Sequence, residues 1–189
     1  MRIISGLNKG KKLIMPKDKK TRPLKDMAKE SVFNILTHSK YINFHFKDSE
    51  VLDLFSGIGS FGLECISRGS KFVFFLENYP PVLEILKNNI SNLKYENKSK
   101  VLNIDAFKVK KNTFKIDQKF QIIFCDPPYK EKKIELLIEN ILQMNILEKD
   151  GIIIIHRKKG ESGTYPKRFK LIDVKNYGLS TFVFGKKSN

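Results

Sequence analysis

An alternation of short apolar runs with longer amphipathic stretches limits this chain to few folds. Runs rich in β-branched and aromatic residues predict strands at 50–55, 71–77, 100–105, 120–126 and 151–157. Between most of these runs, helical spacing or a glycine-led turn predicts helices at 56–70, 78–93 and 132–147. Strands that alternate with helices favour a parallel sheet with helical crossovers, and therefore an α/β domain.

The two ends of the chain add smaller elements to this pattern. Residues 2–15 alternate loosely between apolar and basic, which predicts a hairpin or an extended arm, and a basic loop follows. An amphipathic helix is expected at 23–39, with Pro23 in its first turn. The stretch 168–185 predicts two strands that join the edge of the sheet in an antiparallel sense. We therefore expect a basic N-terminal arm at 1–22 and one domain at 23–189.

The charge of the chain indicates a polyanionic partner. The formal net charge is +16 and the isoelectric point is near 9.7. An AT-rich genome favours Lys, Ile and Asn together, and such drift can account for part of the excess. It does not readily account for the dense N-terminal cluster of basic residues, which are Lys9, Lys11, Lys12, Lys17, Lys19, Lys20, Arg22 and Lys25.

Composition also argues against membrane, disulfide and metal chemistry. No apolar run approaches the roughly 20 residues that span a bilayer, and the basic N-terminus has no apolar signal core. We therefore expect a cytoplasmic protein without a membrane partner. Cys65 and Cys125 lie in apolar surroundings and are expected to be reduced, buried thiols. Because the histidines and cysteines have no metal-ligand spacing, we expect no metal.

The fourth apolar run ends in an unusual corner, Asp126-Pro127-Pro128-Tyr129. Pro127 has no N–H for the strand ladder, and each proline restricts the residue before it to extended angles. The corner therefore holds a carboxylate, two carbonyl groups and an aromatic ring at the carboxyl end of a strand, where α/β proteins bind ligands. The alternative is a simple strand stop with a solvated Asp. One proline would suffice for that, so the second proline and the aromatic residue favour a function.

A glycine-rich turn follows the first strand. Gly57, Gly59 and Gly62 satisfy G-x-G-x-x-G directly before a helix, and Glu77 ends the second strand. Such glycines permit a tight turn and a close approach to a ligand, and the acid suits the ribose hydroxyls of a nucleoside cofactor. The alternative is an ordinary helix-capping turn beside an exposed Glu. The strand, helix and acid around the glycines favour a cofactor loop.

The remaining acids help to choose the cofactor. Asp53 precedes the glycines, where a carboxylate can meet a charged amino-acid group directly or through water, and Asp105 closes the third strand, where it can meet an adenine amino group. Phe107 either packs on the adenine or belongs to the core. S-adenosylmethionine (SAM) has an amino-acid end, a sulfonium and no phosphate, so it fits acids better than a dinucleotide does. With Asp126, these residues place one acid at each of four successive strand ends.

These residues also carry a resemblance to a known family. The blocks "DLFSGIGSFG", "LE", "NIDAF" and "DPPY" resemble class I SAM-dependent methyltransferases that modify exocyclic amines. The blocks "RIISG" and "TRP" near the N-terminus, and "YG" followed by "TFVF", resemble the RsmD family, which methylates the N2 amine of one guanine in bacterial 16S ribosomal RNA. The resemblance runs from Met1 to about Phe184. One departure is His156, because members often carry an acid at the end of the fifth strand.

The resemblance implies a Rossmann-like class I methyltransferase with a seven-stranded sheet of order 3-2-1-4-5-7-6, strand 7 antiparallel and helices on both faces. It implies SAM as cofactor, 16S rRNA or the small ribosomal subunit as partner, and we expect a monomer. The expected cofactor-binding residues are Asp53, Phe55, Gly57, Gly59, Glu77, Asp105, Ala106 and Phe107. The expected catalytic residues are Asp126, Pro127, Pro128 and Tyr129. The expected RNA-binding residues are Lys9, Lys11, Lys12 and Arg22.

The corner suggests how a guanine amine would be methylated. Its lone pair is delocalised, so acceptors on both N–H bonds, here Asp126 and the Pro127 carbonyl, would localise the pair while Tyr129 stacks on the base. The rival hypotheses are a DNA adenine-N6 methyltransferase, a non-catalytic RNA-binding ribosome assembly factor, a dinucleotide oxidoreductase and a protein-glutamine methyltransferase. The oxidoreductase does not explain the corner, and a protein-glutamine enzyme tends to have Asn in place of Asp126. A DNA enzyme usually needs an added recognition domain, and the assembly factor leaves the acids unexplained.

Overall fold

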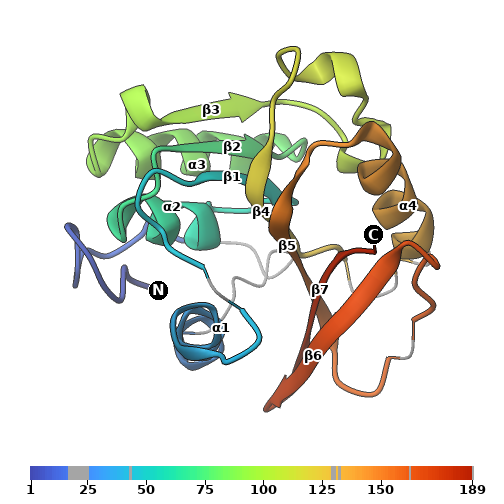
Figure 1. Cartoon of the computed structure of the whole chain (residues 1–189). Helices are drawn as coiled ribbons and strands as arrows, with labels where there is room; N and C mark the ends of the chain where they lie inside the picture. The colour runs from blue at the N-terminus through green and yellow to red at the C-terminus, as the bar shows by residue number, and fades with distance from the viewer. Residues whose placement is uncertain (17–25, 43, 129–130, 132, 162, 189) are drawn as a thin grey trace.

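The computed structural model describes residues 1–16, 26–42, 44–128, 131, 133–161 and 163–188. Its elements surround one mixed sheet (Figure 1). The strands are β1 Glu50–Leu54, β2 Phe72–Leu76, β3 Ser99–Leu102, β4 Phe120–Cys125, β5 Leu147–Lys158, β6 Phe169–Tyr177 and β7 Ser180–Lys187. The helices are α1 Asp26–His38, α2 Ser60–Ser67, α3 Pro80–Asn92 and α4 Ile134–Met144, with short 3-10 turns at η1 Glu96–Lys98, η2 Ala106–Lys108 and η3 Lys111–Thr113.

The sheet has seven strands in the order β3-β2-β1-β4-β5-β7-β6, as predicted. Strands β1 to β5 pair in parallel, whereas β7 pairs antiparallel with both β5 and β6. β1 lies in the centre, where Leu54 stands beside Leu76 of β2 and Cys125 of β4. The carboxyl ends of these three strands therefore meet at one edge of the sheet.

Alternate residues of the buried strands supply two core layers, one on each face. Val51, Val73 and Ile122 pack with α1, α2 and α3 on the first face. Leu52, Phe74 and Ile123 pack with α4 and with the connection after β3 on the second face. This period of two explains why the central strands are apolar throughout. The predicted helices on both faces are confirmed.

Some element boundaries differ from the sequence predictions. α3 begins at Pro80, two residues later than expected, with Tyr79 as its N-cap and prolines at its first two positions. β3 ends at Leu102, so Asp105 lies three residues beyond it and instead caps η2. β5 begins at Leu147 rather than at Gly151. The preceding helix α4 already ends at Met144, and its C-cap Asn145 has a left-handed conformation.

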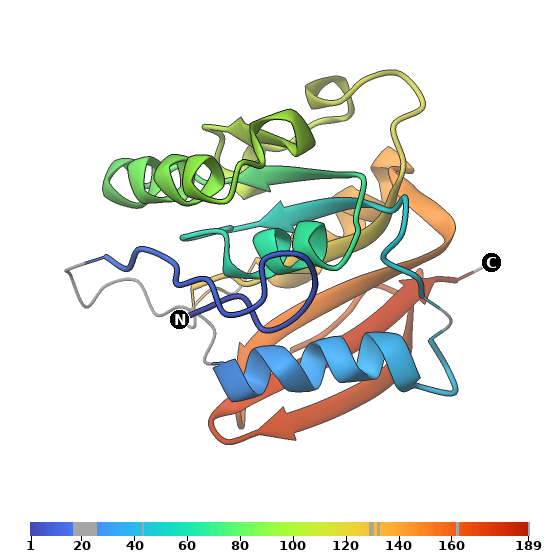
Figure 2. The same ribbon diagram turned by 90° about the vertical axis from the view of Figure 1, so that its left-hand side faces the viewer.

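The N-terminal residues fold back on themselves and lie against α2 (Figure 2). Arg2 bridges Lys12 in an antiparallel sense, and Ile3 N–H donates to the Lys11 carbonyl over 2.9 Å. Ile3 and Leu13 are buried in the first core layer. The expected hairpin is therefore present. The boundary expected at residue 22 lies outside the described residues, so the division into an arm and a domain stays a prediction.

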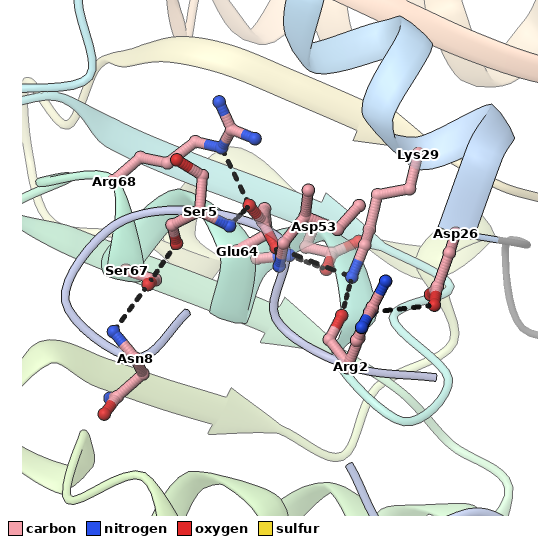
Figure 3. Close-up of polar contacts among 11 residues, drawn as sticks. Arg2, Ser5, Asn8, Asp26, Lys29, Asp53, Glu64, Ser67 and Arg68 are labelled. Carbon is pink, nitrogen blue, oxygen red and sulfur yellow. Dashed lines mark hydrogen bonds and ion pairs between the residues drawn. The ribbon is translucent and has the colours of Figure 1, made fainter. Parts of the chain in front are cut away.

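A buried carboxylate, Glu64 of α2, holds this arm (Figure 3). It accepts the N–H groups of Ile4 and Ser5 over 2.7 and 2.9 Å. Arg68 Nε donates to it over 2.8 Å, and Lys29 Nζ of α1 lies 3.5 Å away. Burial lowers the pKa of Lys29, and the Glu64 charge opposes that shift. Charge and hydrogen bonding at Glu64 thus join the arm, α1 and α2.

Gly62 sits where α2 crosses β2, and its replacement tests this packing. A Cβ there would lie 2.4 Å from Phe75 Cε1 and 2.7 Å from Val73 Cγ1, both fully buried residues. Ala is the better helix former by about 1 kcal/mol, yet we expect Gly62→Ala to lower the free energy of unfolding by about 1–3 kcal/mol through overpacking. Urea unfolding measures the change. Gly163→Ala, with neighbouring atoms no closer than 3.7 Å, is the control. Equal midpoints for the wild type and Gly62→Ala would contradict the packing argument.

Candidate active site

The carboxyl ends of β1, β2 and β4 bring three of the expected acids to one edge of the sheet. Asp53 is the penultimate residue of β1, and Glu77 and Asp126 directly follow β2 and β4. The Asp126 N–H still donates to the Leu54 carbonyl, at 3.4 Å. Because these strands are parallel neighbours, the acids surround the loop that leaves β1.

That loop is held in a tight, left-handed course. Phe55, Gly57 and Gly59 have φ values of 58°, 54° and 84°, a region that only glycine adopts without strain. Ser56 supports the turn, since its hydroxyl donates to the Asp53 carbonyl over 2.6 Å. The loop leads into α2 at Ser60. A strained non-glycine residue beside two such glycines is typical of a ligand-binding turn.

Glu77 is the partner of this loop. Its Oε2 accepts the N–H of Gly57 over 2.8 Å. Its Oε1 accepts the N–H groups of Asn78 and Tyr79 over 2.9 and 2.8 Å. The half-buried carboxylate is thus oriented by the backbone at both of its oxygens. A carboxylate offers about four acceptor positions, so capacity remains for a ligand hydroxyl.

Asp53 lies beneath the loop in a buried position. Its Oδ2 accepts the N–H of Gly62 over 3.0 Å. Burial raises the pKa of Asp53 well above its ordinary value, and the charges of Asp126 and Glu77 raise it further, against the opposing effect of the Gly62 hydrogen bond. The acids therefore share one electrostatic environment, which favours a cationic group among them.

The η2 turn forms another side of this edge. Asp105 caps the turn, and its Oδ1 accepts the Phe107 N–H over 3.0 Å. Ala106 is buried, and the rings of Phe107 and Phe55 lie with their centroids 5.2 Å apart. The two rings, one from the loop after β1 and one from η2, form an apolar surface beside the acids. Such a surface suits a planar aromatic group.

The Asp-Pro-Pro corner extends from β4 as the sequence predicts. Asp126 is partly exposed, Pro127 is buried and Pro128 is exposed. The N–H of Glu131 donates to the Pro128 carbonyl over 2.9 Å, which closes a turn after the prolines. Tyr129 lies outside the described residues, as does Arg22.

Sequence reasoning did not find the partner of Asp126. His156 Nδ1 lies 2.7 Å from Asp126 Oδ1, and its Nε2 lies 2.8 Å from Ser180 Oγ. The register of β4 and β5 explains this contact. Cys125 stands beside Ile155, so the residues that follow them in the chain, Asp126 and His156, are also neighbours. The predicted strand ends, Asp126 and Arg157, are one residue out of this register, so the pairing of Asp126 with His156 is seen only in the folded sheet.

Arg157, the next residue of β5, braces the same corner. Its Nη1 donates to the Glu131 carbonyl over 3.2 Å, and its Nη2 lies 3.1 Å from Glu161. The residue is buried. The turn that follows Asp126 is therefore fixed to the end of β5 by two adjacent side chains.

The predicted RNA-binding lysines lie on the arm. Lys9 is in the turn beside the C-terminal ends of α2 and α3, since Asn8 contacts both Ser67 and the Leu93 carbonyl. α2 begins at the cofactor loop and its eight residues span about 12 Å, so the tip of the arm lies away from the acids. Lys11 and Lys12 lie on the return segment, which leads toward Ile58 through Ile14 and Asn89.

Other chemistry finds little support among the described residues. Both cysteines are free and buried, as predicted, and burial raises the pKa of each thiol. Neither thiol is therefore a ready nucleophile. The described part of the chain contains no group of three or more His, Cys, Asp or Glu placed to hold a metal ion. Within that part, no helix has the length and apolar character to cross a membrane.

A groove of about 670 Å³ is lined by none of these acids. It runs between α4 and the segment before β6, and its lining residues are Lys133, Glu135, Leu136, Glu139, Pro166, Lys167 and Arg168. Its charges are of both signs, and it is open to solvent. The strand-end acids remain the candidate active site.

The sheet order and the acids at its carboxyl edge define a class I methyltransferase. A solved structure of the Escherichia coli protein yhhF, titled as a candidate methyltransferase, agrees over 99% of this chain and 97% of that chain, with a TM-score of 0.82 and 26% identity. The chain belongs to the family described as "Conserved hypothetical protein 95", whose model matches residues 1–186.

Curated relatives cover nearly the whole chain. The YlbH protein of Bacillus subtilis, named as a candidate rRNA methyltransferase, is 33% identical over 188 residues, which are 99% of each chain. "Ribosomal RNA small subunit methyltransferase D" of Haemophilus influenzae is 33% identical over 96% of this chain and 91% of its own length. The resemblance to the RsmD family is thereby confirmed.

The raised pKa of Asp53 predicts a pH-dependent effect of Asp53→Asn. A raised folded-state pKa means that the carboxyl favours folding below its ordinary pKa of about 4 and that this contribution is lost as the pH rises through the folded pKa. Asn keeps an acceptor for the Gly62 N–H but does not ionise. We expect the melting temperature of Asp53→Asn, relative to wild type, to increase as the pH rises from 5 to 9. Thermal unfolding without cofactor measures this, with Glu84→Gln on the exposed side of α3 as control. A constant difference across that range would contradict the effect.

Proposed function

We propose that this protein transfers a methyl group from SAM to the exocyclic N2 amine of a guanine in small-subunit ribosomal RNA. The observation that carries the proposal is the Asp126 carboxylate, held beside the glycine loop at the carboxyl edge of the sheet. Relatives from Haemophilus influenzae and Escherichia coli named as small-subunit rRNA methyltransferases support the choice of RNA. A monomeric state and a contact with the assembled subunit stay predictions.

The residues at the glycine loop fit SAM better than a dinucleotide. The Gly57 N–H, one of the backbone donors that this turn could offer a pyrophosphate, is already donated to Glu77. The acids Glu77 and Asp126 beside Asp53 would repel a phosphate but attract the ammonium of an amino-acid end and a sulfonium. Glu77 would take the ribose hydroxyls, Asp105 the adenine amino group, and the apolar surface formed by Phe55 and Phe107 one face of the adenine. When bound, SAM supplies an electrophilic methyl group on its sulfonium.

The corner would prepare the acceptor amine. A carboxylate oxygen of Asp126 and the carbonyl oxygen of Pro127 would accept hydrogen bonds from the two N–H groups of the amine. These two hydrogen bonds would localise the nitrogen lone pair and direct it at the methyl group. Once methylated, the nitrogen would carry a positive charge and would pass a proton to Asp126 or to water. Tyr129 would stack on the base, which must first leave its own stack.

The direct test is methyl transfer in vitro. Tritiated SAM is incubated with the protein and with ribosomal RNA or small subunits that lack the modification, and the nucleosides are then analysed. We expect label in N2-methylguanosine. Label in N6-methyladenine of DNA would favour the DNA adenine hypothesis, and RNA binding without any transfer would favour a non-catalytic assembly factor.

Glu77→Ala should weaken SAM binding. The variant loses the acceptor for the ribose and also the carboxylate that orients Gly57, so we expect a loss of at least about 1.5–3 kcal/mol, roughly a tenfold to hundredfold rise in Kd. Isothermal titration calorimetry measures the affinity. Glu84→Ala, an exposed acid of α3, is the matched control. Unchanged affinity in Glu77→Ala would rule out the cofactor assignment.

Asp126→Ala should abolish most methylation while SAM and RNA still bind. The carboxylate contacts a neutral amine, so ground-state affinity changes little, whereas the rate should fall by about two to three orders of magnitude. Single-turnover rates at saturating SAM and RNA measure this.

Asp126→Asn separates two causes of the loss, because it keeps an acceptor oxygen but loses the charge. Measurable activity in Asp126→Asn would favour acceptor geometry, and a rate equal to that of Asp126→Ala would favour charge. A wild-type rate in Asp126→Ala would show that the Asp-Pro-Pro corner only ends β4 and has no part in catalysis.

The basic arm should bind RNA through its charge. Neutralising Lys9, Lys11, Lys12 and Arg22 together should flatten the salt dependence of RNA affinity, with the slope falling by roughly 0.7–0.9 for each phosphate that the arm no longer neutralises. Filter binding across a salt series measures the slope. An equal number of exposed lysines elsewhere provides the control set, Lys98, Lys110, Lys111 and Lys115. If both sets change the slope equally, the arm is not a specific RNA-binding segment.

A further inference from the structure

We infer that His156 is a positioning residue for the methyl transfer: it fixes the Asp126 carboxylate so that one oxygen faces the acceptor amine. The inference rests on the proposed function of Asp126. It concerns a residue of β5 whose role the sequence alone left open, and the contacts of His156 with Asp126 and Ser180 supply that role.

The contact between His156 and Asp126 follows from the sheet itself. Asp126 directly follows β4 and His156 lies within β5, and each comes one residue after the paired residues Cys125 and Ile155. His156 is 3% exposed, and its Nδ1 lies 2.7 Å from Asp126 Oδ1. That separation is typical of a charge-assisted hydrogen bond. An ionised carboxylate only accepts, so Nδ1 carries the hydrogen in this contact.

The imidazole is itself held on two further sides. Its ring stacks on Phe182 of β7, with centroids 4.7 Å apart and planes at 12°. Phe182 is the direct antiparallel partner of His156, so the stack is a cross-strand pair. Nε2 lies 2.8 Å from the hydroxyl of Ser180 at the start of β7. With Nδ1 donating to Asp126, these contacts fix both the plane of the ring and its position.

This arrangement restricts the carboxylate at the corner. Asp126 is only partly buried, so a short side chain there would otherwise be able to rotate toward solvent. The hydrogen bond from the imidazole engages Oδ1 of Asp126, so that Oδ2 is left to face the acceptor amine. Since reaction rates are sensitive to misplacement of such groups by about 1 Å, removing this hydrogen bond should lower the rate by roughly tenfold to a hundredfold. Binding of SAM and RNA should not change.

Two substitutions of similar size separate the two ring nitrogens. In His156→Asn the amide nitrogen takes the approximate place of Nδ1 and can still donate to Asp126. In His156→Gln the amide group takes the approximate place of Nε2 and reaches Ser180 instead. We expect His156→Asn to keep a single-turnover rate within a few-fold of wild type. We expect His156→Gln to lose tenfold to a hundredfold in kcat, with the KM for RNA and the Kd for SAM unchanged.

A double-mutant cycle tests whether His156 acts through Asp126. In the Asp126→Ala background, which retains a slow measurable rate, adding His156→Gln should cause no further loss. If the effects of the two substitutions multiply, or if His156→Asn and His156→Gln lose rate equally, the positioning role is wrong. A merely structural role would lower thermal stability in both variants and would not distinguish Asn from Gln.

Ser180→Ala keeps the test decisive if His156→Gln fails to fold. This variant removes only the hydroxyl that holds Nε2, and we expect a threefold to tenfold fall in kcat at unchanged KM. A wild-type rate in Ser180→Ala would then overturn the inference. Failure of the proposed function gives a different result, because the wild-type protein itself would transfer no methyl group to RNA. Transfer by wild type together with a wild-type rate in His156→Gln overturns the inference alone.

Discussion

The parallel pairing of β1 with β2 and β4 is the constraint on which both the core and the site depend. It places Leu54, Leu76 and Cys125 side by side, so the loop after β1, Glu77 and Asp126 leave the sheet together. A slip of one residue would move each side chain of a central strand into the opposite core layer, because side chains alternate with a period of two. The two apolar layers therefore select the same register that assembles the acids.

Several residues of the candidate active site adopt states that are unfavourable for the stability of the fold. Asp53 is a buried carboxyl whose pKa is raised, first by burial and then by neighbouring acids. Phe55 adopts a left-handed conformation without the freedom of glycine. Such features lower stability, and the apolar layers on either side of the sheet compensate for them. Their concentration at one edge is what distinguishes this edge from the rest of the molecule.

The strands, the glycine loop and the acids could be predicted from sequence because they depend on local patterns. The strand order came from the family resemblance, since no local pattern fixes which strands are neighbours. The helix α3 was expected to begin at residue 78, but it begins at Pro80, because the two prolines occupy its first two positions. His156 and Lys29 could not be assigned in the same way. Their partners, Asp126 and Glu64, lie 30 and 35 residues away in sequence (156 − 126 and 64 − 29) and meet them only after packing.

Glu64 shows why the described part of the arm belongs energetically to the rest of the fold. Burying a carboxylate is costly unless charge and hydrogen bonds compensate. Here two of its partners are backbone N–H groups of Ile4 and Ser5, and only the arm supplies them. Without the arm, Lys29 would also lose the Arg2 carbonyl that accepts its hydrogen bond. The same arm reaches Asn89, whose amide contacts both Ile14 and Ile58 of the cofactor loop. The segment that carries the basic residues is therefore built onto the scaffold of the active site, and the two need not be positioned independently.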